Sequence, residues 1–176
     1  MVQWWTTLYP KKEKEETIPM DYLKEYQKWL DSGVLTAEEH AELEAIKDDP
    51  TEIEGRFYGP LEFGTAGLRG TMAMGLHHMN IYVVRHATQG FANVICAEGE
   101  KAKERGVAIA MDCRLHGMEF ARAAAEVCAA AGIKVRIFDA LRPTPELSFA
   151  VRHYGCQAGI NVTASHNPKE YNGYKV

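Results

Sequence analysis

The stretch that decides the fold lies between residues 107 and 138. It reads VAIAM at 107–111, MEFARAAAEVCAAA at 118–131 and KVRIF at 134–138. The first and last pieces are short and apolar, as in strands buried on both faces of a sheet, whereas the middle piece is Ala-rich and long enough for a helix. Gly132 follows at the position where a glycine commonly ends a helix. This order of elements predicts parallel strands covered by helices.

The same alternation continues to the end of the chain. Thr144 is placed to cap a helix in which Pro145 takes the favoured first position, and strands are expected at 158–162 and from 173 onward. We therefore expect an α/β fold over residues 61–176, a three-layer αβα sandwich with a mostly parallel sheet and a mixed edge. In such sheets ligands bind beyond the carboxyl ends of the strands, which directs attention to the loop after residue 162.

Residues 1–60 predict a helical N-terminal extension in front of this domain. A helix is expected over 21–32, with Gly33 as its C-cap. The capping box Thr36-Ala37-Glu38-Glu39 opens a second helix, which Asp48-Asp49-Pro50 is expected to end. These helices carry no recognisable chemistry, so packing is their expected role.

Composition excludes several classes of protein. The chain has 176 residues, of which 46% are hydrophobic and 25% charged, as in a globular protein. Residues 11–54 carry 14 acidic and 6 basic side chains, whereas residues 55–176 carry 10 acidic and 14 basic. The small excess of positive charge in residues 55–176 could attract phosphate groups but is too weak to indicate nucleic-acid binding. No apolar run is long enough to span a membrane, and the four cysteines show no C-x-x-C pair. We expect reduced thiols, a cytoplasmic location and no membrane or nucleic-acid partner.

The loop after the strand at 158–162 concentrates reactive side chains. It reads TASHNPKEYNGYK over 163–175. Ser165 is a potential nucleophile or phosphate carrier, His166 can transfer protons near neutral pH, and Lys175 supplies a point charge. A hydrogen-bonded turn with an incidental Ser and His is the alternative. A serine hydrolase is disfavoured because the G-x-S-x-G elbow is absent and adjacent side chains on an extended loop tend to diverge.

Two further segments have candidate roles. Three glycines at 64–70 leave backbone N–H groups free to approach an anion, and Arg69 adds a bidentate fork for phosphate. Asp112 and Arg114 follow a strand, either as an ion pair that closes a loop or as substrate-binding groups. The pair His77-His78 is expected to face solvent, without a third ligand at metal spacing.

These residues resemble one enzyme family. The segment TASHNP at 163–168 looks like the phosphoserine loop of the α-D-phosphohexomutases, the phosphoglucomutase/phosphomannomutase superfamily, and EFGTAGLRG at 62–70 looks like its N-terminal loop. The segment RPTP at 142–145 and the pair Asp112 and Arg114 also match family elements. The acidic helical front is similar to the subgroup of bacterial phosphoglucomutases and phosphopentomutase-like enzymes.

The resemblance implies a phosphoryl shuttle. Ser165 would carry a phosphoryl group, pass it to a sugar phosphate and recover another from a bisphosphate intermediate, interconverting hexose 1-phosphate and 6-phosphate. One oxygen of its phosphate would bind Mg²⁺, and glucose 1,6-bisphosphate would act as activator. His166, Lys175 and Arg69 are the catalytic candidates, and which of them is the base stays open. The phosphate-binding candidates are Arg69, Thr65, Gly67, Ser165 and Asn167.

The resemblance also implies partners that this chain lacks. Family enzymes take their other Mg²⁺ ligands from a D-G-D-x-D-R loop in a second domain, their sugar specificity from a third and a phosphate clamp from a fourth. We therefore expect a first domain of a phosphoglucomutase at 61–176, inactive alone, with the remaining domains and sugar phosphates as partners. The alternatives are a phosphopentomutase, a phosphomannomutase or a non-catalytic phosphate-binding module.

Overall fold

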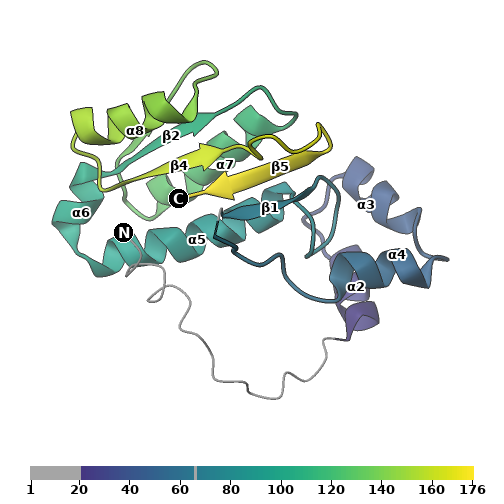
Figure 1. The fold of residues 1–176 in the computed structure, drawn as a ribbon. Coiled ribbons are helices and arrows are strands. Elements are labelled where there is room, and N and C mark those ends of the chain that lie inside the picture. The colour runs from purple at the N-terminus through teal and green to yellow at the C-terminus, as the bar shows by residue number, and fades with distance from the viewer. Residues whose placement is uncertain (1–20, 66) are drawn as a thin grey trace.

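The computed structural model describes residues 21–65 and 67–176, and the expected α/β sandwich is confirmed (Figure 1). Five strands form one sheet in the order β1-β5-β4-β2-β3. β4, β2 and β3 are mutually parallel, whereas β5 runs antiparallel to β4 and β1 antiparallel to β5. The strands are β1 (Leu68–Thr71), β2 (Val107–Met111), β3 (Val135–Ile137), β4 (Ala158–Val162) and β5 (Tyr171–Lys175).

Helices cover both faces of the sheet. α5 (Ile81–Ala97) and α7 (Gly117–Ala130) pack against each other on one face of the sheet, and α8 (Thr144–His153) covers the other face, at the upper left in Figure 1. The short helix α6 (Glu100–Arg105), which the sequence analysis missed, leads into β2. Gly132 has the positive φ of 77° expected after α7.

β2 is the centre of the core because all five of its residues are buried. Val107, Ile109 and Met111 join the large cluster under α5 and α7. Ala108 and Ala110 face the other way, where their small side chains let α8 approach through Leu147 and Ala150. The alternation of large and small residues along VAIAM therefore determines how closely the helices on each face approach the sheet.

Over residues 21–60 the structure has three helices instead of the two predicted there: α2 (Tyr22–Leu30), α3 (Ala37–Glu44) and α4 (Pro50–Phe57). The predicted capping box on α3 is confirmed. α3 ends at Glu44, ahead of the predicted stop at 48–50. The sequence analysis missed α4, which these same residues open: Asp49 accepts hydrogen bonds from the amides of residues 51 and 52, and Pro50 is in the first turn. The prediction of Gly33 as a C-cap was wrong: α2 ends at Leu30, and its C-cap is Asp31, whose backbone is in the right-handed region.

These helices share a core with the loop between β1 and α5. Tyr26, Leu43 and Phe57 are buried together with Met74 of that loop. The carboxylate of Glu42 accepts hydrogen bonds from the Met74 amide at 2.8 Å and from Arg56 at 2.6 Å. The extension is therefore fixed to the sheet domain by both apolar and polar contacts.

Two further expectations were wrong in detail. Thr144 is the first residue of α8 instead of its cap; Pro143 takes the N-cap position, and the Thr144 hydroxyl accepts a hydrogen bond from Asn161. The glycine segment at 64–70 is not loop throughout, because β1 occupies its second half. None of the described helices is long and apolar enough to cross a membrane.

Burial predicts unequal costs for two isoleucines that are partners in the parallel pair of β2 and β3. Ile109 is fully buried, whereas Ile137 is 39% exposed. We expect Ile109→Ala to lower the free energy of unfolding by about 2–5 kcal/mol. The matched control Ile137→Ala should lower it by less than about 1 kcal/mol. Urea unfolding followed by circular dichroism measures both, and equal losses would contradict this account of the core.

Candidate active site

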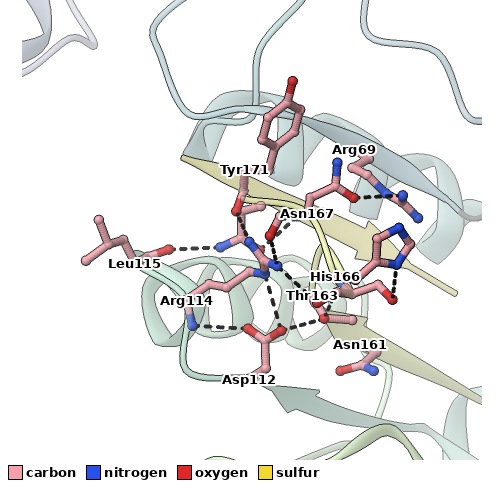
Figure 2. Close-up of polar contacts among 12 residues, drawn as sticks. Arg69, Asp112, Arg114, Leu115, Asn161, Thr163, His166, Asn167 and Tyr171 are labelled. Atoms are coloured by element: carbon pink, nitrogen blue, oxygen red, sulfur yellow. Dashed lines mark hydrogen bonds and ion pairs between the residues drawn. The ribbon is translucent and has the colours of Figure 1, made fainter. Parts of the chain in front are cut away.

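The candidate site begins where β2 and β4 end side by side. The Asp112 amide, just after β2, donates to the Val162 carbonyl at 3.2 Å, so the two strand ends are in register. Beyond them, the Thr163 hydroxyl donates to Asp112 Oδ2 (Figure 2). Parallel pairing therefore brings a carboxylate from residue 112 to the start of the serine loop, which we define as residues 163–170.

The Arg114 side chain holds the serine loop from inside. Its Nη2 donates to the carbonyls of Ser165 at 3.0 Å and Asn167 at 2.7 Å. Its Nη1 donates to the carbonyls of Pro168 and Tyr171, both at 2.8 Å. The side chain is only 10% exposed, and its Nε lies 3.5 Å from Asp112 Oδ2. The sequence analysis interpreted Asp112 and Arg114 either as an ion pair or as substrate-binding groups. Neither interpretation predicted that Arg114 donates to backbone carbonyls.

Ser165 is exposed at the tip of this loop, with an unusual backbone. Its φ is +60°, in the left-handed region that residues other than glycine rarely adopt. The Ser165 amide donates to the Thr163 hydroxyl at 3.0 Å. Contrary to the expected divergence of neighbouring side chains, His166 Nδ1 lies 3.4 Å from Ser165 Oγ. The turned backbone, which an extended loop would not have, brings the two side chains to the same side.

Arg69 reaches the serine loop from the antiparallel edge of the sheet. It lies on β1, opposite Gly173 of β5, and its Nη1 donates to Asn167 Oδ1 at 2.9 Å. Figure 2 shows this contact beside His166. Lys175, at the end of β5, has a pKa below its ordinary value because of partial burial and then repulsion by Arg69, with Asp112 acting in the opposite direction. The structure thus places His166 beside Ser165 and ties Arg69 to Asn167 of the same loop, whereas Lys175 interacts electrostatically with Arg69 and Asp112.

The turn before β1 is built differently from the expected anion cradle. The amides of Gly64 and Gly67 donate to each other's carbonyls, at 3.2 and 3.1 Å, so these two N–H groups are engaged within the turn. Gly67 has φ +87°, and a Cβ there would lie 2.3 Å from the Tyr174 carbonyl of β5. Its glycine is explained by close packing of the turn on β5. Thr65 is exposed, and Ala66 lies outside the described residues.

Other candidate residues lie apart from this cluster. Arg142 forms an ion pair with Glu146 of α8, and its amide donates to the Met111 carbonyl. His77 and His78 are half-buried rather than solvent-facing: His77 contacts the Tyr58 hydroxyl at 2.5 Å, and His78 contacts the Thr71 hydroxyl at 2.8 Å. Burial lowers the pKa of His78.

Sequence reasoning missed Asn172 as a member of the loop scaffold. It is fully buried on β5, donates to the Leu115 carbonyl at 2.8 Å and accepts from the Gly173 amide at 2.8 Å. An Asn directly before a glycine is usually a turn signal, which concealed its role inside a strand. No local pattern could have identified its partner 57 residues away.

Metal-binding groups are sparse in the part of the chain that the structure describes. Residues 21–65 and 67–176 contain no group of three or more His, Cys, Asp or Glu that could hold a metal ion. Asp112, the carboxylate beside the serine loop, is already engaged by Thr163 and Arg114. These residues therefore do not make a Mg²⁺ site by themselves.

Removing the positive charge of Arg69 is expected to raise the pKa of Lys175 toward its ordinary value, because repulsion by Arg69 is one of the two causes that lower it. The test is Arg69→Met with the Lys175 side chain titrated by nuclear magnetic resonance. Arg142→Met, which removes a charge that does not act on Lys175, is the control. An unchanged or lower Lys175 pKa in Arg69→Met would contradict the arrangement described above.

Known proteins are similar to this chain along most of its length. The profile of the phosphoglucomutase/phosphomannomutase α/β/α domain I matches residues 60–176. A human phosphopentomutase is 39% identical over 161 residues, covering 87% of this chain and 26% of the relative. A phosphoglucomutase of Staphylococcus haemolyticus is 42% identical over 123 residues, covering 70% of this chain and 22% of the relative.

The structural comparison agrees with these relatives. A Thermus thermophilus protein provisionally described as a phosphomannomutase is 34% identical, with a TM-score of 0.59 over 66% of this chain and 25% of its own length. The chain spans about a quarter of the length of the curated relatives it matches. The fold, the order of the motifs and the match over residues 60–176 show that the chain belongs to the phosphoglucomutase/phosphomannomutase family and contains its α/β/α domain I.

Proposed function

We propose that this chain supplies the phosphoryl-carrier domain of a phosphosugar mutase, with Ser165 as the carrier. The observation that carries the proposal is the exposed Ser165 on a loop held by side-chain and backbone partners, with His166 beside its hydroxyl and Arg69 bonded to Asn167 of the same loop. The relatives named phosphopentomutase, phosphoglucomutase and phosphomannomutase support the same class of reaction.

The proposed reaction consists of two phosphoryl transfers. In the first, the bond between phosphorus and Ser165 Oγ breaks while a bond forms between phosphorus and a hydroxyl oxygen of the sugar phosphate. The sugar hydroxyl releases its proton, and Ser165 Oγ takes one up. In the second, the other phosphoryl group of the bisphosphate passes back to Ser165 Oγ with the reverse proton movements. The net change moves phosphate from one sugar hydroxyl to another, without oxidation.

The surrounding side chains have separable roles in this scheme. His166 Nδ1 lies 3.4 Å from Ser165 Oγ, so we assign to it the proton that this oxygen gains and loses. Lys175 has a lowered pKa, which makes its neutral amine more available as the base for the sugar hydroxyl. We assign to Arg69 the stabilisation of charge on the transferring phosphoryl oxygens, with Thr65 and Asn167 as further phosphate-binding groups; Gly67 would contribute through its packing on β5, since its amide is engaged by Gly64.

Mg²⁺ belongs to the proposal only in part. A phosphate on Ser165 would offer the ion one oxygen, but the described residues supply no carboxylate cluster to complete its coordination. We therefore propose that the other ligands come from outside these residues, and we assign no step of the reaction to the ion.

The finer identity of the enzyme is also proposed. We place glucose 1-phosphate and glucose 6-phosphate first, with glucose 1,6-bisphosphate as activator, and phosphopentose or mannose phosphates next. Because the chain spans about a quarter of its curated relatives, the residues that choose the sugar are expected elsewhere. We propose residues 1–60 as the extension, residues 61–176 as the carrier domain, and no mutase turnover by the 176-residue chain alone.

The test of the carrier is labelling at Ser165. The gene product that contains this chain, called the parent below, is incubated with glucose 1,6-bisphosphate and Mg²⁺, and phosphate is located by mass spectrometry. We expect phosphate on Ser165. Ser165→Ala should abolish this label and lower mutase activity by about 10³-fold or more, because the carrier oxygen is gone.

Ser148→Ala is the matched control, since Ser148 is an exposed serine on α8. It should label and turn over as the unchanged parent does. A parent that never acquires phosphate on Ser165 under these conditions would favour the non-catalytic phosphate-binding module instead. Comparing glucose, mannose and pentose phosphates as substrates of the same parent decides among the sugars.

A further inference from the structure

The backbone at Ser165 needs an explanation. Of the described residues other than glycine, only His116 and Ser165 have a positive φ. A serine in this region has the ordinary steric penalty of a residue with a side chain, because its Cβ approaches the following carbonyl oxygen. Such a conformation persists at a functional position only when neighbouring groups fix it.

A closed ring of contacts fixes both peptide groups of Ser165. Its carbonyl accepts from Arg114 Nη2 at 3.0 Å, and its amide donates to Thr163 Oγ1 at 3.0 Å. Thr163 Oγ1 in turn donates to Asp112 Oδ2, and this carboxylate oxygen lies 3.5 Å from Arg114 Nε. The ring therefore runs from Arg114 through Ser165, Thr163 and Asp112 back to Arg114 (Figure 2).

The two terminal nitrogens of Arg114 are engaged by the serine loop and by Tyr171 at the start of β5, whereas its buried Nε has no hydrogen-bond partner among the described residues. Its two terminal nitrogens serve four backbone carbonyls, two of them on each nitrogen. A guanidinium has four N–H groups on these nitrogens and one on Nε, which lies beside Asp112. Because the side chain is also largely covered, it has no donor directed to a ligand on the outer surface of the loop. This separates its role from that of Arg69, which has one contact to the loop.

We propose that Arg114 is a positioning residue: with Thr163 and Asp112 it holds Ser165 in the left-handed conformation that presents Oγ beside His166 for phosphoryl transfer. This inference rests on the proposed function of Ser165. Arg114 acts through the loop backbone and does not touch the transferred group. A displacement of the carrier oxygen by about 1 Å is enough to slow transfer on the order of 100-fold.

Thr163 offers the sharpest test because two of its variants differ in a single group of the ring. Thr163→Val removes the hydroxyl that links Asp112 to the Ser165 amide, whereas Thr163→Ser keeps it. In the parent, Thr163→Val should slow labelling of Ser165 by glucose 1,6-bisphosphate roughly 10- to 100-fold, with an effect on kcat larger than that on KM. Thr163→Ser should stay within about threefold of the unchanged parent.

Arg114→Lys completes the test, because an ammonium group is a point donor that cannot reach four carbonyls in two directions. It should slow labelling like Thr163→Val and speed hydrogen exchange over 163–171, while exchange over 107–111 is unchanged. Arg85→Lys is the control, since Arg85 is exposed and has one long contact to Glu126. If Arg114→Lys does not fold, the labelling rates and the hydrogen exchange of Thr163→Val and Thr163→Ser still test whether the ring positions Ser165.

The outcomes separate this inference from the function on which it rests. If the unchanged parent never labels on Ser165, the proposed function fails and the positioning role fails with it. If the parent labels and Thr163→Val labels equally fast, the carrier stands and the ring is not what positions it. Equal losses in Thr163→Val and Thr163→Ser would likewise overturn the role of the hydroxyl.

Discussion

The parallel pairing of β2 with β4 is the constraint on which the rest of the site depends. It aligns Met111 with Val162, so the residues that follow, Asp112 and Thr163, emerge side by side at the carboxyl edge of the sheet. All of β2 and the last three residues of β4 are buried, and helices pack on either face, which leaves the strands little freedom to slide. A one-residue shift of register would separate Asp112 from Thr163 and break the support of the serine loop.

Two cations on the antiparallel strands β1 and β5, Arg69 and Lys175, lie close enough to interact. Arg69 and Lys175 repel each other, and this repulsion contributes to the lowered pKa of Lys175. Neighbouring like charges cost free energy, and a phosphate between them would remove that cost. Arg114, the other cation of the cluster, is neutralised within the loop by Asp112 and by backbone carbonyls. Arg69 and Lys175 are therefore half-buried cations without such neutralisation by the loop, whereas the largely covered Arg114 holds the loop backbone.

The helical extension contributes to the same domain from a distance. Glu42 and Arg56 hold Met74 in the loop that follows β1, and β1 carries Arg69. Tyr82, at the start of α5, packs against Trp29 of α2 with ring centroids 5.7 Å apart. Helices α2, α3 and α4 thus support the antiparallel edge of the sheet. Their buried aromatic side chains serve this packing.

The sequence by itself determined the layers, the parallel core and the reactive loop. Apolar VAIAM and the Ala-rich helix after it are local patterns, and local patterns report burial directly. The motif around Ser165 likewise indicated the family to which the chain belongs. The ends of helices and strands were predicted less well from the sequence. Asp49-Pro50, for example, was expected only to follow the end of a helix, but these residues also begin α4.

Only the tertiary structure decided how the site is assembled. Contacts between residues more than fifty positions apart build it: Arg114 with four backbone carbonyls, Asn172 with the Leu115 carbonyl, and Gly67 with Tyr174 of β5. So does the contact from Arg69 to Asn167. Such contacts depend on strand order and register, and these follow from the packing of the whole sheet and are not encoded in any one segment.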